Sequence, residues 1–264
     1  MGAEDPASGP SHAPQERERL NRFLARAGVA SRRAADSLIA SGSVRVNGER
    51  PPATGLMIDP ENDVVTVDGR RVRPPATHRY LMLNKPLGAI TTARDEASRK
   101  TVLDVVGKEG AQGHRLFPVG RLDGDSTGLL LLTDDGDLSY RLTHPRYKVA
   151  KEYHVTIAGV PKTAEIETLR RGVKLDDGMT APAEVDVVRM DTGGRDSGRA
   201  ELRFVIHEGR HRQVRRMVQA VGHKVISLRR TAFGPLRLDR LRAGEWRVLS
   251  AREVELMRRA AGLR

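Results

Sequence analysis

The loop from Gly120 to Gly128 carries the side chains of this sequence that are best suited to catalysis. It reads GRLDGDSTG and brings two carboxylates, Asp123 and Asp125, close to hydroxyl groups. A carboxylate in a dry pocket can attack an electrophilic carbon or stabilise positive charge on it. Taken alone, however, such a loop is more typical of a polar turn in which Asp and Gly satisfy backbone groups.

The spacing Asp123-x-Asp125-x-Thr127 also resembles the phosphotransfer loop of haloacid-dehalogenase-type hydrolases. Those enzymes need an apolar strand directly before the first Asp and a distant acidic pair that binds Mg²⁺. Here Gly120-Arg121 interrupt the preceding strand, and Asp134-Asp135 follow Asp123 by only eleven and twelve residues. The context therefore argues against a metal-dependent phosphohydrolase.

Three histidines near the C-terminus form a second candidate site. His207 and His211 are four residues apart and His223 follows, so metal ligation is chemically conceivable. Gly209 breaks the helical spacing of the first pair, and the chain has no Cys to complete a ligand set. We therefore expect no metal site, and histidines that face solvent or a bound partner.

The elements before residue 75 predict a small helical unit with short strands. Apolar residues at helical spacing predict a first helix that Gly28 ends, and Ser31 is a suitable N-cap for a second helix that ends at Gly42. Two alternating segments, 44–46 and 64–67, predict strands, and Asn47-Gly48 predicts a tight turn.

The remainder of the chain mixes strand and helix patterns without a regular βαβ repeat, which predicts an α+β fold. Strands are expected at 80–83, 116–119, 129–133, 153–157 and 202–206, and helices around 138–142 and 214–221. We predict a disordered tail over 1–16, a small domain over 17–75, a larger domain over 76–255 and a basic C-terminal tail or helix over 256–264.

The string from Arg19 to Arg50, RLNRFLARAGVASRRAADSLIASGSVRVNGER, resembles the S4 RNA-binding domain of the αL type. The resemblance implies a module that binds RNA through shape and phosphates rather than base sequence. It places the expected RNA contacts on basic residues of the two helices and the following turn: Arg22, Arg26, Arg32, Arg33 and Arg45. From charge spacing alone, an ordinary solvated helix face is an equally good interpretation of these arginines.

The string GRLDGDSTGLLLLTDDG, from Gly120 to Gly136, resembles the active-site motif of the RsuA/RluB family of ribosomal RNA pseudouridine synthases. Four further strings match in order: LNKPLGAITT (83–92), THPRYKVAKEY (143–153), EGRHRQVRRMVQAVGH (208–223) and GPLRLDRLRAGEWR (234–247). Together they cover residues 17–250 approximately, and they imply a catalytic domain with a mixed, largely antiparallel central sheet.

The resemblance assigns roles to four residues of this sequence. Asp123 is the implied nucleophile, and Arg121 is implied to hold phosphate and open the base stack. Tyr153 is implied to stack on the extruded uracil, and Arg215 to keep Asp123 ionised. Without the family, Tyr153 would be interpreted as a core aromatic and Arg215 as a surface residue.

Composition supports a polyanionic partner. The 264 residues carry a formal net charge of +12 and no cysteine, and apolar runs are too short for a membrane helix. We therefore expect a cytoplasmic monomer that binds ribosomal RNA or a pre-ribosomal particle, without metal, small-molecule cofactor or membrane. The expected reaction converts a uridine of large-subunit RNA to pseudouridine. Small-subunit RNA, or a non-catalytic S4-type assembly factor, remains the alternative.

Overall fold

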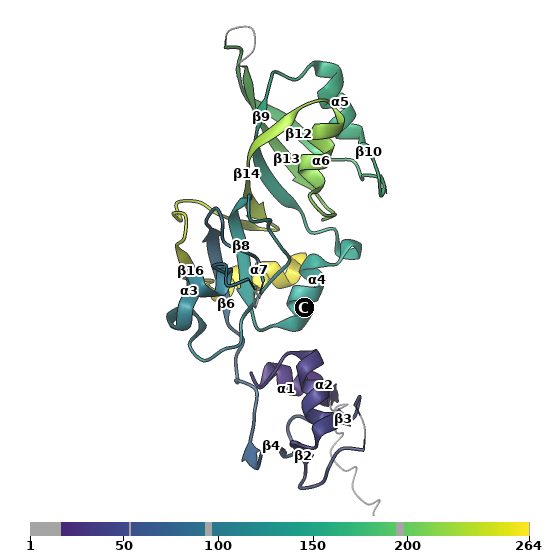
Figure 1. Cartoon of the computed structure of the whole chain (residues 1–264), viewed down its shortest axis with the longest axis vertical. Coiled ribbons are helices and arrows are strands. Elements are labelled where there is room, and N and C mark those ends of the chain that lie inside the picture. Colours follow the sequence, from purple (N-terminus) through teal and green to yellow (C-terminus); the bar gives the residue numbers. More distant parts are fainter. Residues whose placement is uncertain (1–16, 53, 93–96, 194–197, 264) are drawn as a thin grey trace, which may run out of the picture. The chain divides into compact units, whose positions relative to one another are not determined.

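The structure is a computed structural model that describes residues 17–52, 54–92, 97–193 and 198–263 (Figure 1). Its internal contacts divide the chain into two compact units, with the division after Thr77. The sequence placed this boundary after residue 75. The predicted disordered tail, residues 1–16, lies outside the described residues.

The N-terminal unit packs two helices against short strands. Its elements are β1 (Glu18–Arg19), α1 (Leu20–Arg26), α2 (Arg32–Ser41), β2 (Val44–Val46), β3 (Met57–Ile58), β4 (Val65–Val67) and β5 (Arg70–Arg71). Strands β2, β4 and β5 form one antiparallel sheet, and β1 pairs with β3. Its core is small and lies between the helices and the strands: Leu20, Phe23, Leu24, Ala35, Ile39, Val44, Ile58 and Val65.

The local signals in this unit are confirmed. The Ser31 hydroxyl accepts a hydrogen bond from the backbone N–H of Ala34 at 3.2 Å, as an N-cap should. Gly42 ends α2 in the left-handed conformation, with φ +84°. Asn47 and Gly48 both have positive φ, which is the geometry that a type I′ turn requires.

The larger unit is built on one mixed sheet. Among its described residues, nine strands pair in the order β12-β13-β9-β14-β8-β6-β16, with β15 beside β14 and β7 beside β8. Their bounds are β6 (Tyr80–Lys85), β7 (Phe117–Pro118), β8 (Thr127–Thr133), β9 (Lys151–Ala158), β12 (Glu184–Asp191), β13 (Arg199–Ile206), β14 (Lys224–Phe233), β15 (Leu236–Arg237) and β16 (Trp246–Val248). The pairing of β14 with β8 is parallel and all the other pairings are antiparallel, which confirms the predicted fold class.

Helices cover both faces of this sheet (Figure 1). The helices are α3 (Val102–Ala111), α4 (Gly136–Thr143), α5 (Thr163–Arg171), α6 (Gln213–Ala220) and α7 (Ala251–Ala260), with a short 3₁₀ turn at Pro145–Tyr147 and a β10–β11 hairpin (Lys174–Leu175, Gly178–Met179). Successive residues of β8 point to opposite faces. Leu130 and Leu132 join the core with α3, α5 and α6, whereas Leu129 and Leu131 join the core with α4 and α7. Two cores on the two faces therefore hold β8 and its neighbour β6 in place.

Of the two alternatives expected for the C-terminal segment, a basic tail or a helix, the structure shows the helix: residues 256–260 belong to α7, and the segment packs into a core. Met257 and Ala261 are fully buried, and α7 contacts α4. The helix carries both basic and acidic residues, and Met257 is its one fully buried residue, so its apolar stripe is narrow. Within the described residues, no helix is both long enough and apolar enough to cross a membrane.

Candidate active site

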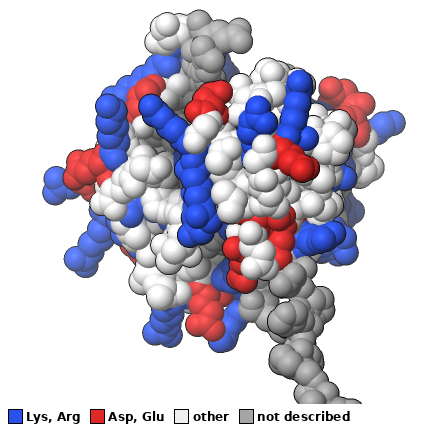
Figure 2. Space-filling model, turned by 90° about the horizontal axis from the view of Figure 1, so that it is seen from below, with Lys and Arg blue, Asp and Glu red and all other residues white. Residues whose placement is uncertain are grey.

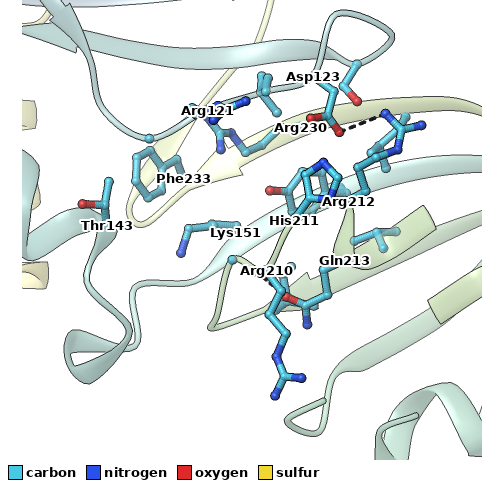
Figure 3. A pocket seen from close by; sticks show the side chains of 18 of the residues that line it. Arg121, Asp123, Thr143, Lys151, Arg210, His211, Arg212, Gln213, Arg230 and Phe233 are labelled. Carbon is cyan, nitrogen blue, oxygen red and sulfur yellow. Dashed lines mark hydrogen bonds and ion pairs between the residues drawn. The ribbon is translucent and has the colours of Figure 1, made fainter. Parts of the chain in front are cut away.

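A cavity of about 380 Å³ lies in the larger unit, beside the loop that precedes β8 (Figure 3). Strands β9 and β14 and the loop before α6 form its other walls. Residues that line it are Val119–Asp123, Ser126, Thr143, Lys151, Tyr153, Ile206, Gly209–Val214, Leu228, Arg230 and Phe233. The volume falls within the range of small-ligand pockets.

The loop that carries Asp123 is held in place by the last residue of β6 and by the segment that follows this strand. The Thr91 hydroxyl donates to the carbonyl of Leu122 at 2.6 Å. The buried ammonium of Lys85 donates to the carbonyl of Ser126 at 2.7 Å, from beneath the loop. These contacts flank Asp123 on both sides in sequence, and its carboxylate remains about one quarter exposed at the cavity.

Arg212 forms the ion pair with Asp123. Its Nη1 lies 3.4 Å from Asp123 Oδ2, the contact that Figure 3 draws as a dashed line. The same guanidinium binds Asp125 with both terminal nitrogens, at 3.2 and 2.8 Å. This fork lowers the pKa of Asp125 and raises that of Arg212, mainly through the hydrogen bond between them.

Arg215, the cation expected beside Asp123, contacts Asp125 instead. Its Nη2 donates to the Asp125 carbonyl at 2.8 Å and lies 3.3 Å from Asp125 Oδ2. Burial lowers the pKa of Arg215, because desolvation disfavours its charge. Arg215 therefore stabilises the loop through Asp125, while Arg212 forms the ion pair with Asp123, the candidate nucleophile.

The other two predicted residues lie at the cavity. Tyr153 projects from β9 with only 8 % of its surface exposed and lines the wall. Arg121 is exposed and lines the cavity from the same loop as Asp123. The structure thus brings Arg121, Asp123 and Tyr153 to one cavity, with Arg215 just outside it.

Two buried cations at the cavity were not predicted from the sequence. Lys151 lies two residues before Tyr153 on β9, and Arg230 lies on β14. Burial, and to a smaller extent the charge of Arg230, lowers the pKa of Lys151 to about 8. The alternation of β9 could have identified Lys151, whereas the strand that carries Arg230 had no pattern that the sequence analysis recognised.

The acidic pair Asp134-Asp135 serves the fold at the other end of β8. His78 and His114 contact the Asp134 carboxylate at 3.2 and 2.8 Å. Burial alone would raise the pKa of Asp134, but these hydrogen bonds outweigh it and lower the pKa to about 2. Asp135 accepts from the first N–H groups of α4. Seven residues of strand, roughly 20 Å, separate this pair from Asp123, so the phosphohydrolase arrangement is not formed.

The three histidines considered as metal ligands each have separate surroundings. His207 contacts the carbonyl of Lys148, and His223 contacts the carbonyl of Ala158 and the carboxylate of Glu165. His211 lines the cavity. In the part of the chain that the structure describes, no group of three or more His, Cys, Asp or Glu is arranged to hold a metal ion.

The five arginines expected to bind RNA fall into two groups. Arg22 and Arg26 both contact the buried carboxylate of Glu18, at 3.5 and 2.7 Å. Arg32 and Arg33 are exposed at the start of α2. Arg45 is exposed and donates to the carbonyl of Gly48. The first group stabilises the unit, and the second is available to a ligand.

Lys and Arg side chains also project from the face drawn in Figure 2, with acidic side chains among them. The basic side chains of this face can attract a polyanion.

Comparison with known proteins gives one consistent result. Residues 79–220 match the family model "RNA pseudouridylate synthase", and residues 18–50 match the S4 domain. The chain is 41 % identical to "Ribosomal large subunit pseudouridine synthase B" of Bacillus subtilis, over 92 % of this chain and 97 % of the relative. It is 41 % identical to an uncharacterised RNA pseudouridine synthase of Aquifex aeolicus, over 93 % and 96 % of the two chains.

A solved pseudouridylate synthase has the same architecture. It superposes with a TM-score of 0.64 at 32 % identity, and covers 90 % of this chain and 99 % of its own. Sequence and fold therefore agree over nearly the whole length: this chain belongs to the RNA pseudouridylate synthase family, with an S4 domain ahead of its catalytic unit.

Proposed function

We propose that this enzyme isomerises a uridine of large-subunit ribosomal RNA to pseudouridine. Relatives named as large-subunit pseudouridine synthases, in Bacillus subtilis and Vibrio cholerae, support this choice of RNA, since each aligns with more than 90 % of this chain. Ribosomal RNA, free or in a pre-ribosomal particle, is thus the proposed partner. The enzyme would act on this RNA in the cytoplasm, as a monomer and without a cofactor.

One observation carries the proposal: the Asp123 carboxylate lies at a cavity that also presents Tyr153, and Arg212 is paired to that carboxylate. Isomerisation of uridine needs a carboxylate near C1′, an aromatic surface for the base and a cation that keeps the carboxylate charged. The cavity presents all three within one unit.

The proposed chemistry is balanced without any added reagent. Asp123 attacks C1′ and the C1′–N1 bond breaks, so that both bonding electrons remain on uracil. The base then rotates, C5 bonds to C1′ and the Asp123–C1′ bond breaks. The C5 proton leaves, with the Tyr153 hydroxyl close to this transfer, and N1 takes up a proton. The product is an isomer of the substrate.

A uridine inside folded RNA must leave its stack before it can enter this cavity. Arg121 is exposed on the loop that carries Asp123, where it can hold a phosphate next to the extruded nucleotide. Exposed arginines of the S4 domain, Arg32, Arg33 and Arg45, would hold more distant phosphates. In this proposal, one set of residues positions the RNA and another carries out the isomerisation.

The decisive experiment maps pseudouridines in ribosomal RNA from cells with and without this enzyme, and then with Asp123→Asn in its place. We expect one large-subunit position to lose its pseudouridine without the enzyme. Asp123→Asn should fail to restore it, because an amide keeps the shape of the side chain but cannot form the ester or balance the charge. Purified Asp123→Asn should keep its unfolding temperature and its RNA affinity.

Asp239→Asn is the matched control, because it removes an exposed carboxylate of the same unit outside the cavity. It should restore the modification fully. If a pseudouridine disappears from small-subunit RNA instead, the substrate is small-subunit RNA. Turnover by Asp123→Asn would show that Asp123 is not the nucleophile. If neither RNA loses a pseudouridine when the enzyme is absent, a non-catalytic assembly factor would be favoured.

A further inference from the structure

The cavity holds more positive charge than its one lining carboxylate can balance. The cations that line it are Arg121, Lys151, Arg210, Arg212 and Arg230, and the carboxylate is Asp123. Two of these cations are matched by acidic residues: Arg212 by Asp123 and Asp125, and Arg210 by Asp177 and Glu208. The excess charge belongs to exposed Arg121 and to the buried pair Lys151 and Arg230.

Lys151 and Arg230 are buried without a carboxylate partner among the described residues. Lys151 is 9 % exposed and Arg230 is 2 % exposed. Lys151 donates to the Val149 carbonyl at 3.0 Å, and Arg230 Nε donates to the Leu129 carbonyl at 2.7 Å. Arg230 Nη2 is buried and has no hydrogen-bond partner, which is costly unless a ligand supplies one.

The pair lies next to the aromatic residue proposed to hold the base. Lys151 and Tyr153 are two residues apart on β9 and therefore share a face of the strand. Arg230 is the residue of β14 that pairs with Tyr153. Both cations also lie over the Phe233 ring, at 5.6 and 5.0 Å from its centroid. In Figure 3, Lys151 and Phe233 lie across the cavity from Asp123 and Arg212.

The depth of the pair favours a base over a phosphate as its ligand. A phosphodiester carries a ribose on each side, which makes a nearly enclosed guanidinium hard to reach. A flat uracil ring has no such attachment at its O2 and O4 edges. Uracil is neutral when it enters, but breakage of the C1′–N1 bond leaves the electron pair on the ring, and its charge spreads to these oxygens.

We propose that Lys151 and Arg230 donate hydrogen bonds to the carbonyl oxygens of the extruded uracil and stabilise the negative charge it acquires when the C1′–N1 bond breaks. This assignment rests on the proposed function. It adds to that function the groups that stabilise the negative charge on the base. Asp123 meets the positive charge that develops on the sugar, and the cationic pair meets the negative charge on the base. Fixed donors aimed at developing charge act strongly in a site that excludes water.

The test uses the full-length enzyme and an RNA fragment that contains the mapped uridine. Lys151→Met should lower the single-turnover rate at saturating enzyme by about 100-fold, the scale for loss of one such donor. Its RNA affinity and the salt dependence of that affinity should stay unchanged. Lys151→Arg should recover most of the rate, because it keeps a charged donor. Lys174→Met, which removes an exposed lysine outside the cavity, is the control.

A second arm asks which atoms the cations contact. Sulfur in place of O2 or O4 of the target uridine is a weaker hydrogen-bond acceptor. The wild-type enzyme should slow on one of these substrates, and the loss caused by Lys151→Met should be smaller on that substrate than on normal RNA. Arg230→Met, if it folds, should show the same pattern, and the lysine variants suffice if it does not.

Three outcomes would overturn the proposal. Lys151→Met could keep its rate within about threefold, or it could lose the same factor on all three substrates. It could also keep its saturated rate but bind RNA more weakly, with a salt slope reduced by about 0.7–0.9, which would assign the pair to a backbone phosphate. Failure of the proposed function would look different, because the wild-type enzyme itself would form no pseudouridine.

Discussion

Among single residues, Lys85 shows most clearly that building the candidate site lowers the stability of the folded chain. Its side chain is fully buried, and its ammonium donates to the carbonyls of Ser126 and Pro86 at 2.7 and 3.2 Å. Burial lowers the pKa of Lys85 to about 8, against the charges of Asp123 and Asp125, which raise it. The chain thus keeps a cation in an unfavourable position next to the loop that carries Asp123.

We predict that the stability of this enzyme depends on pH through Lys85. Between pH 8 and the unfolded pKa near 10.4, the unfolded chain binds more protons than the folded chain, so stability rises with pH. The free energy of unfolding of the wild type should increase relative to Lys85→Met, by at most about 1.4 kcal/mol per pH unit. Urea unfolding at pH 7, 8, 9 and 10 measures this difference, and parallel pH curves for the two proteins would contradict the assignment.

The residues of the site differ in how far the sequence could predict them. Asp123 and Tyr153 stand inside ordered strings, so their roles could be hypothesised before any geometry was known. The choice between Arg212 and Arg215 could not be made that way. The two lie three residues apart around the start of α6, and only the turn of the chain there aims Arg212 at Asp123 and Arg215 at Asp125.

At the scale of elements, the β14–β8 pairing joins two antiparallel halves of the sheet. It is short: Arg229 and Arg230 pair with Thr127 and Gly128. Gly128 has φ +105°, and a Cβ there would collide with the backbone oxygen of Arg230. A glycine is therefore required where the two halves meet, directly after the loop that carries Asp123.

We predict that Gly128→Ala destabilises the enzyme by about 2–5 kcal/mol, because it adds both backbone strain and a steric clash. Gly136→Ala is the control, since a Cβ there meets nothing within 4 Å at the first residue of α4. It should stay within about 1 kcal/mol of the wild type. Thermal and urea unfolding measure both, and equal stabilities would show that the junction adapts.

Two of the elements that escaped prediction, β12 and α5, bury few apolar residues. Strand β8 has a long apolar run because both of its faces are buried, so its pattern is plain. Strand β12 has one fully buried apolar residue, Val185, and helix α5 buries only Ile166 and Leu169. So few apolar residues make these two elements hard to recognise in the sequence, and the order of the nine strands depends on pairings that no local pattern contains.

At the scale of the whole molecule, RNA binding and chemistry are assigned to separate units. Residues 17–75 contain 11 Lys and Arg and 7 Asp and Glu, a net charge of +4. We predict that the double substitution Arg32→Ala, Arg33→Ala weakens RNA binding and reduces its salt slope by about one unit per lost phosphate contact. The single-turnover rate at saturating enzyme should change little, because the cavity is intact.

The matched control is Arg70→Ala, Arg71→Ala, which removes two exposed charges from β5 of the same unit. It should affect affinity less than the α2 variant. Normal binding combined with a lost saturated rate in the α2 variant would mean that the S4 domain takes part in the catalytic step.

We also predict that activity persists in excess EDTA, because the proposed steps use only a carboxylate, an aromatic hydroxyl and cationic side chains. The measurement needs an RNA fragment folded in monovalent salt, so that loss of Mg²⁺ does not unfold the substrate. Activity that disappears and returns only with a divalent ion, while RNA structure is unchanged, would contradict the mechanism.

The short parallel pairing of β14 with β8 also joins parts of the cavity that lie far apart in sequence. Thr127 and Arg229 are about one hundred residues apart in sequence, and closing so long a loop is a slow, entropically opposed step of folding. Asp123 belongs to one half of the sheet, while Tyr153 and Arg212 belong to the other. Asp123 therefore meets Tyr153 and Arg212 only when the two halves of the sheet have paired, so a nascent chain that has made only the first half holds an incomplete cavity.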